Sequence, residues 1–476
     1  MPTSRRQFLR VVAIGGASTF AGCGRSTPPG EVDGGFDGGV FKDAGFPDAG
    51  ASLDAGTTPD AGIPAVENPE IITESPALFG FGIAAGDALE DRIILQTRYL
   101  GVEPLRLRVW RMDGTTYAEL VADQAVTAGD GGFLHLDVQG LRPGTKYRYA
   151  FLHGTTGRSP IGKFRAALGP LQTEPLIFGA CCCTNNSIAP KPLARAAERD
   201  DLDAFLLLGD TSYNDGADSL SEYRAKWASS LSRPEYRSLR SSVAVVATWD
   251  DHEVTNDFNP ELISASKLAT ARRTFFESLP VRRNAMESDR LWRSFRWGGT
   301  AELFVLDGRG ERKPSSLLSI NHIYLSRAQM DWFKASLKAS PCVFKVIMNS
   351  VPITDFGFSA FNFDSWRVYQ LQRKEILEFI EDEGIEGVLW VSGDHHFASF
   401  GTVSATGPGS SAIEVLAGPG GQSGSVLHKL LAKPRFEYAS DTNNYLAIHL
   451  LPATRQYRIV FHDGAGVNLF EKTFST

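Results

Sequence analysis

The stretch Gly387-Val-Leu-Trp-Val-Ser-Gly-Asp-His-His396 is an apolar run followed at once by an aspartate and two histidines. Three upstream stretches have the same form and read IFGACCC (177–183), AFLLLGDTSY (204–213) and SVAVVATWDDHE (242–253). Each apolar run is typical of a buried strand. Ligands of open α/β sheets bind outside the carboxyl ends of the strands. Strands that end in Cys, Asp, Tyr, Asn and His therefore predict a polynuclear metal site on an α/β sheet.

These strand ends offer a mixed set of metal ligands. Asp210 and Tyr213 share one short loop, where a carboxylate can bridge two cations and a phenolate suits Fe(III). Cys181 offers a thiolate just upstream. Asp394 and His396 are expected on one face of a strand end, because side chains alternate along a strand with a period of two.

The motif Trp249-Asp-Asp-His-Glu supplies the expected chemistry. Asp251 and Asn256 flank His252 as candidate ligands, and Asn349, after the expected strand 343–348, is a further oxygen donor. Sulfur, nitrogen and oxygen ligands favour a transition metal, and the surplus of oxygens also suits Ca²⁺ or Mg²⁺. The sequence has no Gly-x-Ser-x-Gly elbow and no Walker loop. A metal-bound hydroxide is therefore the expected nucleophile, with His252 as general acid and Asp251 as the second catalytic candidate.

Each of these residues also has an ordinary structural explanation. A Gly-Asp pair at a strand end is common, and His395 and His396 could be structural histidines. At least two of Cys181, Cys182 and Cys183 are expected to be small buried hydrophobic residues. The Trp-Asp-Asp-His-Glu motif is far more specific, and in combination the motifs favour a metallohydrolase.

Composition narrows the class of protein further. The 476 residues allow two or three domains, and 42% hydrophobic and 22% charged residues are ordinary for a soluble globular protein. A net charge of −7 argues against a nucleic-acid-binding surface, and no protein partner is implied. The five cysteines, Cys23, Cys181 to Cys183 and Cys342, are not a disulfide framework.

The N-terminus predicts export and a lipid anchor. Residues 4–10 read SRRQFLR and resemble a twin-arginine motif, and the apolar stretch that follows is too short to span a bilayer. It ends in Phe20-Ala-Gly-Cys23, which resembles a lipobox, so Cys23 is the candidate lipidation site; an ordinary cleaved signal is the alternative. We expect export by the twin-arginine route and anchoring to the cell envelope, facing the periplasm or the exterior.

Composition and hydrophobic periodicity divide the chain into four expected segments. Residues 1–23 are the expected signal, and residues 24–70, rich in Gly, Asp, Ala and Pro, form an expected disordered linker. Residues 71–170 alternate in hydrophobicity, with strands expected at 92–99, 105–111, 133–138 and 147–152, and predict a small β-sandwich. Within it, Leu141–Tyr149 resembles the closing hairpin of a fibronectin-type or immunoglobulin-like module. Residues 171–476 alternate strands and helices, with a capping box at Ser326–Gln329 and strands at 413–416, 445–451 and 457–461 completing a second sheet.

From about residue 78 onward the chain resembles the PhoD-like alkaline phosphatase/phosphodiesterase family, a branch of the calcineurin-like metallophosphatases. The matching motifs are Phe178-Gly-Ala-Cys181, Gly209-Asp-x-x-Tyr213, Trp249-Asp-Asp-His-Glu followed by Asn256, Asp307-x-Arg309, Gln329-x-x-Trp332, Asp364-x-Trp366 and Gly393-Asp-x-His396.

The resemblance implies a four-layer αββα metallophosphatase sandwich, preceded by the β-sandwich, that hydrolyses phosphate esters with Fe³⁺ and Ca²⁺ or other divalent metals. Its implied metal ligands are Cys181, Asp210, Tyr213, Asp251, Asn256, Asp394 and His396. Its implied substrate-binding residues are Arg309, Asp364, Trp366 and Arg373, since arginine binds phosphate bidentately. Arg367 is a further candidate for this role.

Two other functions remain open from the sequence. A phospholipase D-type phosphodiesterase acting on lipid head groups would suit a tethered protein. A non-catalytic surface-binding protein with a structural metal core is the alternative from another class. The intact His252 counts against it, because a purely structural site needs no proton donor.

Overall fold

The computed structural model describes residues 68–476 except 155–156 and 358–364. The expected export signal with Cys23, the linker up to residue 67 and the candidate Asp364 lie outside the described residues. The first described element, η1 (Pro69–Ile71), begins just before the expected linker boundary.

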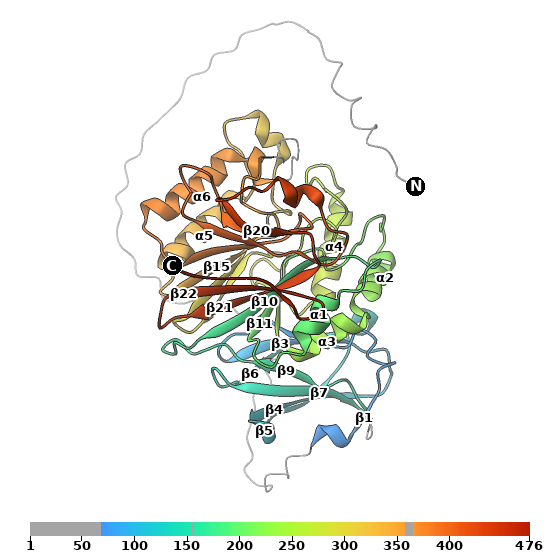
Figure 1. The fold of residues 1–476 in the computed structure, drawn as a ribbon. Coiled ribbons are helices and arrows are strands. Elements are labelled where there is room, and N and C mark those ends of the chain that lie inside the picture. Colours follow the sequence, from blue (N-terminus) through green and yellow to red (C-terminus); the bar gives the residue numbers. More distant parts are fainter. Residues whose placement is uncertain (1–67, 155–156, 358–364) are drawn as a thin grey trace, which may run out of the picture. The chain divides into compact units, whose positions relative to one another are not determined.

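The central sheet, as far as the chain is described, has ten strands in the order β23-β22-β21-β10-β11-β12-β2-β3-β6, with β19 beside β10 (Figure 1). Its parallel middle strands β10, β11 and β12 carry three of the four motif-bearing apolar runs. The strands are β2 (Ile83–Gly86), β3 (Arg92–Arg98), β6 (Phe133–Gln139), β10 (Leu176–Thr184), β11 (Ala204–Leu207), β12 (Val245–Ala247), β19 (Pro419–Gly421), β21 (Asn444–Leu451), β22 (Gln456–Asp463) and β23 (Asn468–Ser475).

A second sheet, of seven strands in the described chain, has the order β13-β14-β15-β16-β18-β17-β20. Its strands are β13 (Arg293–Trp297), β14 (Ala301–Val305), β15 (Phe344–Met348), β16 (Val388–Ser392), β17 (Ala398–Thr402), β18 (Ile413–Leu416) and β20 (Phe436–Ser440). The three C-terminal strands expected to complete this sheet exist, but only β18 joins it. The other two, β21 and β22, extend the first sheet by antiparallel pairing of β21 with β10. That prediction was wrong because a strand's own residues do not specify its partner.

Helices cover the outer faces of the two sheets. The sheets face each other across a shared core that contains Leu206 and Val246 from one and Leu303 and Val346 from the other. The outer face of the first sheet packs against α1 (Lys191–Ala197), α2 (Leu220–Leu231), α3 (Pro234–Ser242) and α4 (Ala265–Ser278). The outer face of the second packs against α5 (Arg327–Ala339) and α6 (Gln370–Asp382) (Figure 1). The α/β class predicted from the sequence is confirmed.

The N-terminal strands divide between two sheets. Those outside the central sheet form a six-stranded sheet in the order β1-β8-β7-β4-β5, with β9 beside β7, within the described residues. They are β1 (Thr73–Glu74), β4 (Leu105–Asp113), β5 (Thr116–Val126), β7 (Lys146–His153), β8 (Gly157–Arg158) and β9 (Gly162–Arg165). The expected strands 92–99, 105–111, 133–138 and 147–152 correspond to β3, β4, β6 and β7.

Two contacts define this N-terminal region. Tyr147 Oη accepts a hydrogen bond from the Arg142 amide at 2.7 Å, the tyrosine-corner contact of immunoglobulin-like sandwiches. Gly86 of β2 pairs with Val245 of β12, and a Cβ at Gly86 would lie 2.6 Å from the Val245 carbonyl oxygen. A glycine is therefore required where the N-terminal strands join the central sheet. In the described residues β2, β3 and β6 share a core with β4 and β7 and continue into the central sheet through this one pairing.

The start of α5 differs from a capping box. Ser326 caps the helix by accepting from the Gln329 amide at 3.2 Å. The Gln329 side chain, however, turns away from Ser326 and bonds to both backbone groups of Asp307. It therefore ties α5 to the end of β14. The remaining short helices are η2 (Asp130–Gly132), η3 (Pro314–Leu318), η4 (Trp366–Val368) and η5 (Val426–Leu430). None of the helices among the described residues has both the length and the apolar composition needed to cross a membrane.

Candidate metal centre

Three groups of ligand-bearing side chains meet beyond the carboxyl ends of the motif-bearing strands. In each group the candidate ligand atoms all lie within 4.8 Å of one another. The groups are Cys183 with Asp210 and His396, Asp210 with Asp251 and His252, and Asp250 with Asp251 and Asp394. Because Asp210 and Asp251 each belong to two groups, the three form one continuous cluster.

The backbone of this cluster is unusual. Four of its residues, none of them glycine, have left-handed backbone angles, with φ of 50° at Cys183, 53° at Asp210, 71° at Asp394 and 57° at His396. Such conformations are uncommon for residues with a Cβ, and they concentrate at functional sites where the surrounding structure imposes them. The strand ends are therefore shaped to turn these side chains towards one another.

Glu253, which was not among the predicted site residues, fixes the loop of Asp210. Its carboxylate accepts hydrogen bonds from the amides of Asp210, Thr211 and Ser212 at 3.0, 2.5 and 3.3 Å, and from the amide of Asp250 at 2.8 Å. One buried side chain thus holds the Gly-Asp loop against the Trp-Asp-Asp-His-Glu loop. The signal for this residue in the sequence is the final glutamate of the Trp-Asp-Asp-His-Glu motif.

The carboxylates of the cluster repel one another. Burial, followed by repulsion from Asp251 and Asp250, raises the pKa of Asp210 well above its ordinary value. Burial also raises the pKa of Asp250, although Arg309 opposes the shift. The pKa of Asp394 is lowered, because its hydrogen bond from His395 and the charges of His395 and Arg309 outweigh the effect of burial. A bound cation would relieve this repulsion.

Buried oxygen atoms support cation binding. Oδ1 of Asp210, Oδ2 of Asp250 and Oδ1 of Asn349 are buried, and none has a hydrogen-bond partner among the described residues. Buried polar atoms in folded proteins almost always have a partner. Coordination of a metal ion would satisfy these oxygens, so the residues present fit the metals that the sequence implies.

The thiol in the cluster belongs to Cys183, not to the predicted Cys181. The sulfur of Cys181 lies 3.6 Å from the carbonyl oxygen of Asn444, inside the core beneath the helices. Strand β10 continues to Thr184, so Cys183 lies within the strand. Regular alternation would place Cys183 on the side of Cys181, but its left-handed backbone breaks that alternation.

Asp394 and His396 also lie in the cluster, but on a different backbone conformation from the predicted strand end. Strand β16 ends at Ser392, so neither residue is part of a strand. They belong to different groups of the cluster, Asp394 with Asp250 and His396 with Cys183. The structure brings both residues into the cluster, but the period-two argument for them was wrong because neither lies in a strand.

His252 lies at the edge of the cluster with an unpredicted partner. Its Nδ1 is 2.6 Å from Oδ2 of Asp215, and its ring lies over Tyr213 with centroids 4.1 Å apart. Although burial opposes the charge, the hydrogen bond to Asp215 and the charge of Asp251 raise the pKa of His252 to about 9. Tyr213 Oη donates to Oδ2 of Asp210 at 3.1 Å, as expected for residues on one loop.

Asn256 is brought near this edge by its backbone. Its amide donates to Oδ1 of Asp215 at 2.6 Å, while its side chain is exposed and donates to Asp257. Its role as a metal ligand stays a prediction.

The expected substrate-binding residues lie deeper than a substrate contact requires. Arg309 is fully buried and pairs with Asp250 and, at 3.1 Å, with Oδ1 of Asp394. Arg373 is buried and donates to the carbonyl oxygens of Ile353 and Val403. Trp366 is fully buried and its ring lies 4.0 Å from that of Tyr324. Of these three side chains, only Arg309 contacts the carboxylates of the cluster, and Asp364 lies outside the described residues.

The other candidate clamp, Arg367, is partly exposed and pairs with Asp355. Because its guanidinium group is partly exposed, Arg367 is compatible with both a surface role and a contact to substrate.

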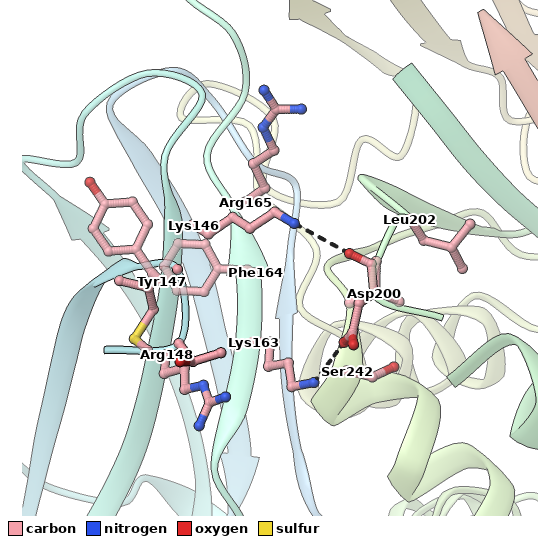
Figure 2. A pocket seen from close by; sticks show the side chains of 13 residues that line it. Lys146, Tyr147, Arg148, Lys163, Phe164, Arg165, Asp200, Leu202 and Ser242 are labelled. Carbon is pink, nitrogen blue, oxygen red and sulfur yellow. Dashed lines mark hydrogen bonds and ion pairs between the residues drawn. The ribbon is translucent and has the colours of Figure 1, made fainter. Parts of the chain in front are cut away.

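A pocket of about 250 Å³ that is partly open to solvent lies away from this cluster, between β7, β9 and the loop before β11 (Figure 2). Figure 2 shows Lys146 and Lys163 both pointing to Asp200, at 3.3 Å from its carbonyl oxygen and 3.0 Å from its carboxylate. This loop precedes the amino end of β11, whereas Asp210 follows its carboxyl end. The pocket is therefore lined by the contacts of Lys146 and Lys163 with Asp200 and is not part of the metal centre.

Two sheets packed face to face between helices, with a carboxylate-rich metal centre at their strand ends, define a layered metallohydrolase architecture. The family model described as PhoD-like phosphatase matches residues 178–450, and that of the PhoD-like phosphatase N-terminal domain matches residues 67–168. The chain belongs to the PhoD-like phosphatase family, as its motifs predicted.

Known proteins of this kind resemble the chain along most of its length. Alkaline phosphatase D of Bacillus subtilis (strain 168) is 25% identical in an alignment 376 positions long that covers 67% of this chain and 64% of that protein. The chain thus spans just under two thirds of this curated relative. A structure of PhoD has a TM-score of 0.72 at 21% identity and covers 83% of this chain and 89% of its own. Purple acid phosphatase PPD1 from yellow lupin (Lupinus luteus) has a TM-score of 0.59 at 13% identity, covering 83% and 73%. These structures share the fold.

Proposed function

We propose that this protein is a metal-dependent hydrolase of phosphate esters, an activity in keeping with the name of its relative alkaline phosphatase D. The observation that carries the proposal is the convergence of Cys183, Asp210, Asp251, Asp394 and His396 on strand ends with left-handed backbone turns. A structural metal site needs only a closed set of ligands. A neighbouring proton donor, His252 with Asp215, is the addition that a hydrolase requires.

The donor set suits two cations of different character. One set of ligands combines sulfur, oxygen and nitrogen, which is appropriate to iron; it consists of Cys183, Asp210, Tyr213 and His396. The other set consists of the carboxylates of Asp250, Asp251 and Asp394, which suit a hard cation such as Ca²⁺. When bound, such ions polarise a phosphoryl oxygen and lower the pKa of water. We infer Fe³⁺ and Ca²⁺ as the metals.

The protein's own residues then have defined tasks. His252 holds a proton on its imidazolium and, with Nδ1 fixed by Asp215, presents Nε2 to a leaving-group oxygen. Arg309, buried between Asp250 and Asp394, pairs with both carboxylates and orients them, and its charge favours their ionised forms against the effect of burial. Glu253 keeps the Asp210 loop in its left-handed conformation.

A panel of three substrates tests this function and separates its alternatives. We expect hydrolysis of p-nitrophenyl phosphate or bis-p-nitrophenyl phosphate that is lost on chelation and in Asp210→Asn. Release of choline from phosphatidylcholine as the main activity would instead assign a phospholipase D-type phosphodiesterase. Absence of hydrolysis of all three by metal-loaded protein would favour a non-catalytic surface-binding protein and overturn the proposal.

We further propose that the chain consists of a signal (1–23), a linker (24–70), an immunoglobulin-like β domain (71–170) and a four-layer αββα catalytic domain (171–476). Arg5-Arg6 and Cys23 support export by the twin-arginine route and anchoring through a lipid on Cys23. In the native host, Cys23→Ala is expected to release the protein from the membrane fraction. Retention of that variant after a high-salt wash would remove the lipid anchor.

A further inference from the structure

The short helix η5 presents a cluster of apolar side chains to solvent. Val426 is 65% exposed, Leu427 40% and Leu430 62%. Single exposed apolar residues are ordinary on protein surfaces, but three on one five-residue turn form a patch. The turn lies next to β20, on the side of the molecule that carries the second sheet (Figure 1).

The patch is held firmly beside the metal centre. The Ser425 amide, at the start of η5, donates to the carbonyl oxygen of His396 at 2.8 Å. On the far side of η5, Leu431 packs against the small core that contains Phe397. Arg435 donates to carbonyl oxygens of Asp355 and Val403 at 2.8 and 2.7 Å. Because both ends are fixed, the apolar side chains are displayed by a rigid turn.

The charged side chains of the segment that contains the patch are cationic. The segment 423–436 contains no Asp or Glu, and the exposed Lys429 and Lys433 flank Leu430. Arg435 and His428 add cationic or ionisable groups, and the nearest acidic partner is Asp441, 3.9 Å from the His428 ring. Apolar side chains bordered by lysines are the composition that binds the interface of an anionic membrane.

We propose that η5 and its flanking lysines dock on an anionic phospholipid bilayer. The leucines and Val426 enter the head-group region while Lys429 and Lys433 contact lipid phosphates. A second copy of the chain fits this surface less well, because a symmetric pairing of two such turns would bring like charges together. Docking would place the bilayer beside His396, at the mouth of the strand-end cluster. This surface is independent of the proposed hydrolysis.

Vesicle binding tests the proposal without recourse to activity. The full chain carrying Cys23→Ala, which removes the proposed lipid anchor, is sedimented with vesicles of phosphatidylglycerol and phosphatidylcholine, and with phosphatidylcholine alone. We expect a higher partition coefficient with phosphatidylglycerol that falls as salt rises. Leu430→Asp and Val426→Asp should each lower it about 10-fold or more, because each removes an inserted apolar side chain. Val102→Asp, at a 97% exposed position in the loop between β3 and β4, is the matched control and should not change it.

The lysines give an independent measurement. Lys429→Glu should lower partitioning to anionic vesicles about fivefold or more, since each cation near such a surface adds to the binding free energy. Lys374→Glu, on α6, is the control. Circular dichroism and melting temperature establish that each variant is folded. Equal partitioning of Leu430→Asp, Val426→Asp and Val102→Asp, or a dimer in light scattering that Leu430→Asp dissociates, would overturn the proposal.

Discussion

Nδ1 of His252 lies 2.6 Å from Oδ2 of Asp215, a residue outside every motif that the sequence offered. The carboxylate fixes the imidazole and, together with Asp251, raises its pKa to about 9 in spite of burial. His252 is therefore protonated at neutral pH and into the alkaline range. This is the state in which an imidazole can donate a proton to a leaving alkoxide.

Asp215→Asn should move the alkaline limb of activity to lower pH. The variant removes the hydrogen bond and charge that raise the pKa of His252, so the pKa should fall towards the ordinary 6.5. The proton is then lost at lower pH, and activity that depends on it declines earlier. The measurement is the pH profile of kcat/KM for an alkyl phosphate ester, with Asp218→Asn, an exposed neighbour, as control. An unchanged profile would exclude the Asp215–His252 pair from proton transfer.

His252→Ala should discriminate between leaving groups. General acid catalysis typically contributes about 10²–10⁴-fold, so alkyl phosphate esters should slow by about that factor. p-Nitrophenyl esters, whose leaving group needs little protonation, should slow much less. Metal content is measured in parallel. Equal losses for both ester types, or loss of the metal, would assign His252 a different role.

Glu253→Gln should loosen the metal centre without touching a candidate ligand. In the wild-type protein the carboxylate of Glu253 accepts hydrogen bonds from the backbone amides of Asp210 and Asp250. The side chain of Gln is uncharged, and its NH₂ group is a donor that cannot accept them. An unsatisfied buried amide costs about 1–3 kcal/mol, so a clear drop in melting temperature and in bound metal is expected. Glu198→Gln, at an exposed position, should change neither. Full metal content in Glu253→Gln would show that the loop keeps its shape unaided.

The motifs located the site, but backbone geometry decided which residues enter it. The apolar runs and the Gly-Asp, Trp-Asp-Asp-His-Glu and Gly-Asp-His-His motifs pointed to Asp210, Asp251, Asp394 and His396, which the structure brings together. The choice between Cys181 and Cys183 failed because alternation holds only while the backbone is extended, and φ at Cys183 is 50°. A single sequence contains no signal for that turn.

Contacts between residues far apart in the chain could not be predicted from the sequence either. Asp215 and His252 are 37 residues apart, and β21 pairs with β10 across most of the folded chain. The amphipathic patterns of β3, β4, β6 and β7 gave the strands correctly. They did not reveal that β2 joins β12, because one backbone pairing at Gly86 makes that junction.

Substitution of Cys183 should lower the bound metal, whereas substitution of Cys181 should not. Cys183→Ser replaces the thiol that lies with Asp210 and His396, so bound transition metal should fall. Cys181→Ser changes a buried thiol against the Asn444 carbonyl oxygen and should leave metal content unchanged. The measurement is metal analysis of both purified variants. Loss of metal in Cys181→Ser alone would restore the assignment first made from the sequence.

Iron at this site should give the protein a colour. A phenolate or thiolate on Fe³⁺ absorbs visible light by charge transfer, which Zn²⁺, a d¹⁰ ion, and Ca²⁺ do not. Tyr213→Phe should shift or weaken the band, because it removes the oxygen that lies 3.1 Å from Oδ2 of Asp210. Tyr236→Phe, on α3, is the control. A colourless enzyme that is fully active with zinc alone would overturn the iron assignment and leave the hydrolase proposal standing.

Metal removal should make stability depend on pH in a defined direction. Without cations, burial and mutual repulsion raise the pKa of Asp210 and Asp250 above the ordinary 3.8. A carboxyl whose folded-state pKa is raised contributes stability that is fully present below its unfolded pKa and is lost as pH rises through the folded value. The melting temperature of chelated protein should therefore fall relative to that of metal-loaded protein as the pH rises above the ordinary carboxyl pKa of 3.8, since bound cations neutralise the same carboxylates. Comparing the two forms cancels the titration of groups elsewhere in the chain. Asp210→Asn should flatten the difference, because the amide cannot ionise. Parallel curves for chelated and loaded protein would show that the repulsion among these carboxylates is not relieved by metal binding.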